Sequence, residues 1–257
     1  MVRFYTAVAA VALMTACATP MATQEASMMD APAAMEMPAV TIYHLEGRRS
    51  ERIVWLMEEL EMPYTLEYVP GDLGASMAKV KALGHDMPQV PTVVIGDQVL
   101  VESGAIIETI INRYSPGKLT PEMASEDYAA HIMWLHYAEG SLASRLFSDY
   151  RAWMANPPTK RSPMVDSEAV VQYSENYLAA NPYFGGDEFS AADIMMLWPL
   201  NVAMKLNLVE AENFPQINAW MAKMEARPAY QRMVKAARPN GIPGMLRPVP
   251  KHAPSER

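Results

Sequence analysis

The feature that most constrains the fold is the order of strand and helix patterns between Val40 and Gly117. Apolar residues recur at strand spacing in four short runs and at helical spacing in three, with turn residues between them. The order β-α-β-α-β-β-α predicts a thioredoxin-like α/β domain with a four-stranded mixed sheet over 40–117. The predicted strands are 40–45, 64–69, 92–95 and 98–101, and the predicted helices follow Ser50 as N-cap, include Met77 to Leu83, and start at Ser103.

After Leu119 the pattern is helical only, which predicts an all-α domain over 120–237. Ser190 and Asp193 have the form of a capping box in which aspartate replaces glutamate. Five prolines among the last residues predict an extended tail over 238–257. The four predicted helices run from Ser125 to about Trp153 with a kink near Gly140, from Val165 to Ala180, from Ser190 toward Leu206, and from Pro215 onward.

The first 39 residues differ in composition from the rest. Arg3 is the only charged residue before an apolar run at 8–14, and the single cysteine, Cys17, follows. A charged start and a short apolar run are typical of a secretory signal, here 1–16, and the run is too short to span a bilayer. Residues 17–39 hold no basic residue and no hydrophobic period, so we expect a flexible tether. Its five methionines could bind copper(I), but without histidines or regular spacing a low-complexity linker is the simpler interpretation.

The segment that ends at Cys17 resembles a bacterial lipoprotein signal, in which the cysteine becomes the lipidated first residue. Ala16 and Cys17 fit that pattern, whereas Met14 and Thr15 depart from it. The resemblance implies a lipid anchor in the bacterial cell envelope, facing the periplasm, with the outer membrane preferred because Ala18 is not an aspartate. The alternatives are an ordinary signal peptide with an incidental cysteine, and a soluble protein whose start is wrongly assigned.

Charge and cysteine content exclude several classes of function. The chain has 21 basic and 29 acidic residues, a net charge of −8 and no basic segment, so nucleic-acid binding is not expected. One cysteine excludes an internal disulfide, a CxxC redox pair and a cysteine-rich zinc site. His131 and His136 are close in sequence, but their spacing points them about 140° apart on a helix, so no metal site is expected.

Several motifs, in the right order between residues 40 and 236, resemble the glutathione S-transferase family. The resemblance is closest to the bacterial and fungal branch with a Ser-Arg-Ser loop and a Tyr-Ala-Glu-Gly segment, here Tyr137–Gly140. It implies a thioredoxin-like domain followed by an all-α domain, glutathione as co-substrate, and a homodimer. The motifs are Tyr43 through Ser50, Trp55–Leu60, Val90–Val94, Val101–Ile106, Phe189–Ile194 and Arg227–Tyr230.

The resemblance also implies where glutathione would bind. In the family the Val90–Pro91 bond is cis, and the Val90 backbone pairs with the cysteinyl backbone of glutathione as an added strand. Ser103 and the start of its helix suit the γ-glutamyl carboxylate, because a helix start offers free N–H groups, and Glu102 would meet the ammonium. Gln89 can bind the glycyl carboxylate, without the charge of the lysine common there. A trans proline that only begins a strand and a serine that only caps a helix are the alternatives.

The loop that should activate the glutathione thiol departs from the family. The first serine of the family's loop is Arg48 here, so no hydroxyl or thiol stands at 47–49. Tyr43, Arg49 and Ser50 remain as candidates, because a cation or a hydroxyl donor beside sulfur favours the thiolate. Alternatively, Tyr43 only packs in its strand, Arg49 is a solvated charge and Ser50 only caps the first helix.

Two functions of different class follow from the resemblance. The first is a glutathione transferase that activates the glutathione thiol for conjugation to, or reduction of, a hydrophobic electrophile. Its acceptor would lie between the two domains, against the long helix at Tyr137 and Ser141. The second is a membrane-tethered protein that binds glutathione or a hydrophobic ligand without turnover. The altered loop, and the scarcity of reduced glutathione expected outside the cytoplasm, keep this second function as the alternative to the transferase.

Overall fold

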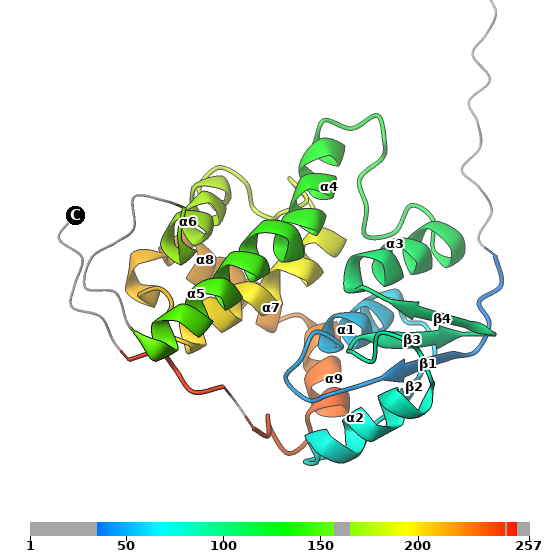
Figure 1. Ribbon diagram of the computed structural model, residues 1–257. Helices are drawn as coiled ribbons and strands as arrows, with labels where there is room; N and C mark the ends of the chain where they lie inside the picture. Colours follow the sequence, from blue (N-terminus) through cyan, green and yellow to red (C-terminus); the bar gives the residue numbers. More distant parts are fainter. Residues whose placement is uncertain (1–34, 157–164, 245, 251–257) are drawn as a thin grey trace, which may run out of the picture. The chain divides into compact units, whose positions relative to one another are not determined.

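Figure 1 shows the computed structural model of the chain. The predicted signal segment, Cys17 and most of the predicted tether lie outside the residues that the structure describes. The described residues are 35–156, 165–244 and 246–250.

The last part of the predicted tether packs against the fold. Residues 35–39 have no regular secondary structure, but Met35 N donates a 2.9 Å hydrogen bond to Arg113 O. Met37 is partly buried and contacts the hydrophobic core. The folded part of the chain therefore begins a few residues before Val40.

The first half of the described chain is an α/β layer structure (Figure 1). Its elements are β1 (Val40–Tyr43), α1 (Glu51–Leu60), β2 (Thr65–Glu67), α2 (Leu73–Ala82), β3 (Thr92–Ile95), β4 (Gln98–Val101) and α3 (Ser103–Tyr114). The strand order is β2-β1-β3-β4, in which β1 runs parallel to β2 and β3 runs antiparallel to β1 and β4. The predicted thioredoxin-like arrangement is confirmed, with each predicted strand and helix of this half present.

Burial along β1 explains how the sheet is covered. Val40 and Ile42 are buried, whereas Thr41 and Tyr43 are half-buried, because successive side chains point to opposite faces. The apolar stripes of α1 and α3 cover one face of the sheet, and α2 covers the other (Figure 1). The loop between β1 and α1 and the start of α3 therefore lie close to the helical half.

The second half of the described chain is helical, as predicted. Its elements are α4 (Asp127–Tyr137), the π-helix η1 (Ala138–Ala143), α5 (Ser144–Ala155), α6 (Ser167–Leu178), α7 (Ala191–Lys205), the 3-10 turn η2 (Ala211–Asn213), α8 (Pro215–Glu225) and α9 (Pro228–Ala237). The long helix is confirmed, since α4, η1 and α5 are continuous, and the π turn that interrupts it contains Gly140, where a kink was predicted. The capping box of Ser190 and Asp193 is also present.

The helix α9 was not predicted as a separate element. Pro228 stands at its first position, and Tyr230, Met233 and Ala237 are buried on one side. This side packs on α1, where the ring centre of Tyr230 lies 5.1 Å from that of Trp55. The last helix in sequence thus completes the core around the first helix.

Candidate functional site

Two segments meet at one end of the sheet. The Val90–Pro91 bond before β3 is cis, as the resemblance implied. Gln89 Nε2 donates a 3.0 Å hydrogen bond to Glu102 Oε1, so the turn before β3 lies against the residue that precedes α3. Glu102 is exposed and has a φ of 70°, a left-handed conformation that non-glycine residues rarely adopt and that is concentrated at ligand sites. The structure therefore brings together the residues proposed for glutathione on sequence grounds.

Ser103 is the first residue of α3 and is only 3% exposed. Glu102 occupies the N-cap position, so the expectation that Ser103 caps the helix is wrong. Ser103 Oγ instead accepts a 3.1 Å hydrogen bond from Arg52 Nη1. The first N–H groups of a helix have no partner within it, so an anion placed here would meet backbone donors beside a buried Ser103.

A buried arginine joins the two halves of the described chain. The side chain of Arg52 is 1% exposed, and besides Ser103 it binds Glu139 and donates a 2.7 Å hydrogen bond to Met195 O. Glu139 also accepts a 2.8 Å hydrogen bond from Arg49 Nε. Burial by itself would raise the pKa of Glu139, but the charges and hydrogen bonds of the two arginines outweigh it and lower that pKa. Glu139 is therefore held ionised.

Arg52 and Glu139 were given no role from the sequence. A signal was present, because Arg49 and Arg52 are three residues apart around the start of the first helix and Glu139 is the one acid in an apolar, small-residue segment. Arg49 itself turns toward the helical half, where its guanidinium carbon lies 4.4 Å from the ring centre of Trp198. Its charge is shared with Glu139 instead of being solvated.

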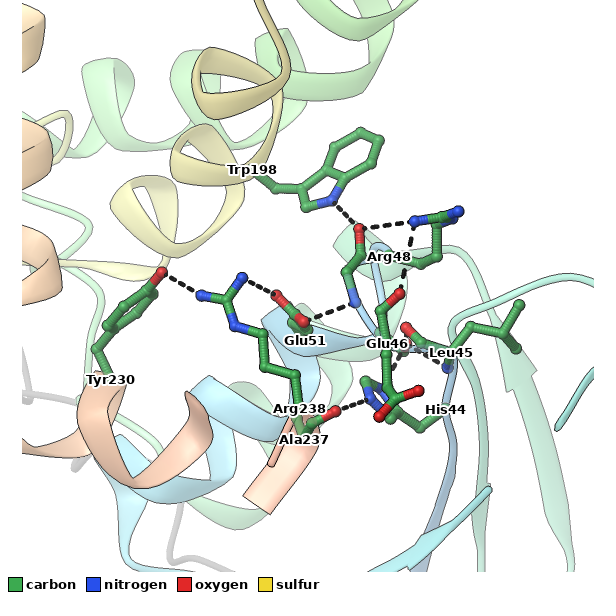
Figure 2. A network of polar contacts seen from close by, with 11 residues as sticks. His44, Leu45, Glu46, Arg48, Glu51, Trp198, Tyr230, Ala237 and Arg238 are labelled. Carbon is green, nitrogen blue, oxygen red and sulfur yellow. Dashed lines mark hydrogen bonds and ion pairs between the residues drawn. The ribbon is translucent and has the colours of Figure 1, made fainter. Parts of the chain in front are cut away.

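Ser50 is fully buried, and its hydroxyl is already engaged. It lies 2.8 Å from His44 Nδ1, and Leu45 N donates to it over 3.2 Å. His44 Nε2 lies 2.6 Å from Ala237 O (Figure 2). Because a carbonyl oxygen only accepts, we assign the ring proton to Nε2, so that Nδ1 accepts from Ser50. Burial lowers the pKa of His44 to about 4 and keeps the ring neutral.

Ser50 is the N-cap residue of α1, as predicted, but its Oγ is bound to His44 and makes no cap hydrogen bond. The same contact points its hydroxyl into the interior, so it has no opening toward a bound thiol.

The loop between β1 and α1 is covered by the last described residues. Arg48 Nη2 donates a 3.0 Å hydrogen bond to Gly244 O. Trp198 Nε1 donates a 3.2 Å hydrogen bond to Gly47 O, the dashed line that begins at Trp198 in Figure 2. A Cβ placed on Gly47 would come within 2.3 Å of Ile242 Cγ2, so only glycine fits under this contact. Arg48, which stands where the family has serine, therefore binds the tail at Gly244.

Further contacts fix the tail. Arg238 donates a 2.8 Å hydrogen bond to Tyr230 OH and lies 3.7 Å from Glu51 (Figure 2). Val249 is buried, and its N donates a 2.9 Å hydrogen bond to Leu206 O. The described part of the predicted tail has no helix or strand, in agreement with the sequence, but it is docked along the fold.

Tyr43 is half-buried at the end of β1. Its register partner in β3 is Thr92, the residue that follows Pro91. Of the three candidates for thiol activation, Tyr43 is thus the one whose backbone adjoins the Val90–Pro91 turn.

Tyr137 and Ser141 lie elsewhere than expected. They line a hollow between the long helix and α6, and no described residue of the β1–α1 loop lines it. Tyr137 OH donates a 3.0 Å hydrogen bond to Val170 O, and burial together with Tyr173 raises the pKa of Tyr137 to about 12. An acceptor position between the domains against these two residues is therefore wrong; Glu139, which lies between them in sequence, faces α1.

A cavity of about 290 Å³ lies between α1, α7, α9 and the tail. Trp55, Trp198 and Met233 contribute to its apolar wall, and Arg48 and Arg49 line the side nearest the loop. Unlike the hollow beside α6, this cavity borders both halves of the described chain.

Across the described residues, no group of three or more His, Cys, Asp or Glu side chains is placed to hold a metal. Within those same ranges, no helix is long and apolar enough to cross a membrane. Cys17, the predicted lipid anchor, lies outside them.

Comparison with known proteins finds the same two domains. Residues 48–113 match the family described as glutathione S-transferase, N-terminal domain, and residues 158–228 match glutathione S-transferase, C-terminal domain. Among curated proteins, glutathione S-transferase 3 of Schizosaccharomyces pombe is 28% identical over 209 residues, which cover 74% of this chain and 84% of that protein.

Solved structures share the fold over most of the chain. A glutathione S-transferase from Actinobacillus pleuropneumoniae has a TM-score of 0.63 and 25% identity, covering 77% of this chain and 92% of its own. The theta class glutathione S-transferase from the citrus canker pathogen Xanthomonas axonopodis pv. citri, with glutathione bound, has a TM-score of 0.59 and 26% identity. The match covers 77% of this chain and 98% of that structure's chain. These names agree with the predicted class of enzyme, a glutathione transferase, and the chain belongs to the glutathione S-transferase family.

Proposed function

We propose that this protein is a glutathione-dependent transferase, which activates the glutathione thiol for conjugation to, or reduction of, a hydrophobic electrophile. The hydrogen bond between Gln89 and Glu102 carries the proposal, because it joins the turn before β3 and the start of α3 into one polar site. The N–H groups at the start of α3, beside Ser103, would receive the γ-glutamyl carboxylate, and Glu102 its ammonium. The Val90 backbone after Gln89 would pair with the cysteinyl part, and Gln89 would reach the glycyl carboxylate.

Tyr43 is our first choice for activating the thiol. Its strand end adjoins the Val90–Pro91 turn, and a phenol that donates a hydrogen bond to sulfur favours the thiolate. Arg49 contributes positive charge, reduced by its ion pair with Glu139.

The experiment is the thiolate absorbance of bound glutathione as a function of pH. We expect Tyr43→Phe to raise the ionisation pH of the bound thiol by about 1–3 units, and Arg49→Ala to raise it less. Ser50→Ala should leave it unchanged, because the Ser50 hydroxyl faces His44. Tyr128→Phe, at the start of α4, is the matched control. A Tyr43→Phe curve that overlays the wild type would assign the activation elsewhere.

A second function is favoured by the state of the loop, in which Ser50 is buried and Arg49 is ion-paired with Glu139. A protein with such a loop could bind glutathione, or a hydrophobic ligand, without turnover. If the wild type binds glutathione but neither lowers its thiol pKa nor turns over a model electrophile, the binding protein replaces the enzyme.

We also propose that Cys17 carries a lipid anchor in the bacterial cell envelope, facing the periplasm and preferably in the outer membrane. The single cysteine at the end of a signal-like segment supports this. Cys17→Ala should abolish metabolic labelling with a fatty acid and release the protein from the membrane fraction. Unchanged fractionation would contradict the anchor.

A homodimer is the expected assembly, since twofold dimers are the commonest oligomers. Met133 and Tyr173 are 37% and 47% exposed, and the Tyr173 hydroxyl lies 3.5 Å from the Met133 sulfur, so α4 and α6 share an exposed apolar patch. A partner subunit would cover it. Light scattering at micromolar concentration should give twice the mass of the chain, and a monomer would count against the dimer.

A further inference from the structure

The hydroxyl of Ser103 is engaged on one side only. Ser103 is the first residue of α3, and its Oγ accepts a 3.1 Å hydrogen bond from Arg52 Nη1. A guanidinium has donors and no acceptor, so this contact uses the serine oxygen and leaves its proton free. Among the described residues, no hydrogen bond is formed in which the Ser103 hydroxyl donates. The hydroxyl is therefore set to donate to a bound group.

Backbone donors are available at the same place. The first hydrogen bond within α3 runs from Ile106 N to Glu102 O over 2.9 Å, so the N–H groups before Ile106 have no partner in the helix. Gly104 is half-buried and Ala105 is exposed, which leaves the helix start accessible. Free N–H groups and the helix dipole favour an anion. These N–H groups and the Ser103 proton therefore form one set of donors for an anionic group.

Arg52 is held by partners in three different elements. Its side chain is 1% exposed, and besides Ser103 in α3 it binds Glu139 in η1 and donates a 2.7 Å hydrogen bond to Met195 O in α7. The packing of these elements fixes the guanidinium without any ligand. A donor that is oriented in advance avoids the cost of ordering it when a ligand binds. Arg52 therefore fixes the direction of the Ser103 hydroxyl before binding.

The charges of this network do not cancel. Glu139 binds both Arg49 and Arg52, so two positive charges share one negative charge in these contacts. Arg52 carries its part of the excess to the side of Ser103 that faces the protein interior. Charges are screened less in a buried setting than in water, so this excess favours a carboxylate at the start of α3.

We propose that Arg52 is a positioning residue for substrate recognition: it directs the Ser103 hydroxyl toward the γ-glutamyl carboxylate and makes the site select thiols that carry this carboxylate. The inference rests on the proposed transferase function and adds to it a residue that acts through Ser103. Glu139 sets how much of the Arg52 charge reaches the site. If Arg52 only held the two halves together, its loss would weaken the binding of every ligand to the same degree.

The test compares glutathione with its decarboxylated analogue, 4-aminobutyryl-cysteinyl-glycine. The analogue keeps the ammonium, the thiol and the glycyl end, and lacks only the γ-glutamyl carboxylate. Titration calorimetry of the full chain gives the ratio of the two dissociation constants. Partial unfolding lowers the binding of both ligands alike, so the ratio reports recognition. The wild type should bind glutathione about 10–100-fold more tightly, the range for hydrogen bonds to a charged group.

Substitutions at the two ends of the contact should act on this ratio together. Ser103→Ala should lower it about tenfold, because the backbone N–H groups alone remain. Arg52→Lys keeps the positive charge but cannot hold all three partners, so it should lower the ratio at least about threefold. In the Ser103→Ala background, Arg52→Lys should change the ratio no further. Arg227→Lys, which alters a 2.7 Å ion pair with Glu59, is the matched control and should keep the wild-type ratio.

A second variant covers the case in which Arg52→Lys does not fold. Glu139→Gln removes the negative charge that offsets Arg52 and leaves the arginine in the chain. The ratio should then rise about two- to threefold, because more of the positive charge acts on the carboxylate. A general loosening of the site would lower the ratio instead.

Two outcomes would overturn the role of Arg52 alone: a wild-type ratio in Arg52→Lys, or, if that variant does not fold, a ratio that Glu139→Gln leaves unchanged or lowers. Failure of the proposed function gives a different result. A wild type that binds neither ligand would reject glutathione binding altogether. A wild type that binds both equally would reject the γ-glutamyl site, and the role of Arg52 with it.

Discussion

Arg52 shows how one side chain can position several segments at once. From α1 it reaches Ser103 in α3, Glu139 in η1 and Met195 O in α7. A planar guanidinium has five donors in a fixed fork, whereas a lysine ammonium is a compact point charge. Arg52 therefore links the start of α3, where the proposed glutathione carboxylate binds, to the helical half.

His44 makes stability depend on pH. In the folded protein its pKa is about 4, whereas its ordinary value is 6.5, because burial disfavours the charged ring. The unfolded chain takes up a proton on His44 at a higher pH than the folded protein does. The stability that neutral His44 gives the folded protein is therefore complete above about pH 6.5 and is lost as the pH falls toward 4. The effect is on the order of 3 kcal/mol in the free energy of unfolding.

The corresponding experiment is urea unfolding at pH 7 and pH 5. His44→Gln should lower stability at pH 7 and reduce the loss between the two pH values. Part of the loss should remain, because burial also lowers the pKa of His131 to about 4. His85 accepts a hydrogen bond from Met87 N and belongs to neither buried site, so His85→Gln should keep the wild-type pH dependence. A His44→Gln slope equal to the wild type would refute the assignment.

At the scale of elements, boundaries set by local chemistry were predictable and contacts made over long distances were not. The strands, the capping box at Ser190 and the long helix that includes Gly140 depend on nearby residues, and each is present. Ser50 has the local form of an N-cap, but His44 and the distant Ala237 O fix it in the interior. The role of Ser50 therefore depends on the contact between His44 and Ala237 O, which the sequence around Ser50 does not reveal.

The placement of Tyr137 and Ser141 follows from helix geometry. These two residues are four apart and share one face of the long helix, which lies against α6. Glu139 is two residues after Tyr137, so it points to the opposite side, toward α1. Spacing predicts that these faces are opposite, but which of them meets α1 depends on the packing of distant segments. Helix α9 was missed because its ten residues are stabilised by packing on α1.

The contact between the β1–α1 loop and the tail predicts the effect of two glycine substitutions. Gly47 and Gly71 have φ values of 72° and 79°, so alanine at either position carries the same backbone strain of about 1–2 kcal/mol. Only at Gly47 does a Cβ meet Ile242, whereas nothing lies within 4 Å at Gly71. Gly47→Ala should therefore lower the free energy of unfolding by a further ~1–3 kcal/mol.

A double variant separates strain from collision. Gly47→Ala combined with Ile242→Ala removes the steric clash and leaves the backbone strain. The loss in free energy of unfolding should then approach the loss for Gly71→Ala plus that for Ile242→Ala alone. Equal losses for Gly47→Ala and Gly71→Ala in denaturant unfolding would show that the tail is not seated on the loop.

For the whole molecule, the two halves share one interface, which should make them unfold together. Helix α9 follows the helical half in sequence yet packs on α1, where Tyr230 contacts Trp55 and Arg227 binds Glu59 over 2.7 Å. Arg52 adds polar bonds across the same interface. We expect far-ultraviolet circular dichroism and tryptophan fluorescence to report coincident urea transitions. Two separated transitions would mean that the interface is too weak to couple the halves.

The order in which the chain is synthesised determines when the contacts between the β1–α1 loop and the tail can form. The partners of His44 and Arg48 are Ala237 and Gly244, 193 and 196 residues further along. Because the N-terminal part emerges from the ribosome first, the β1–α1 loop must wait for these partners until the tail has been synthesised. A chain terminated before Ala237 would leave the His44 ring without its acceptor and the cavity between α1, α7, α9 and the tail without part of its wall. The final geometry of the β1–α1 loop is therefore set only after the helical half has been made.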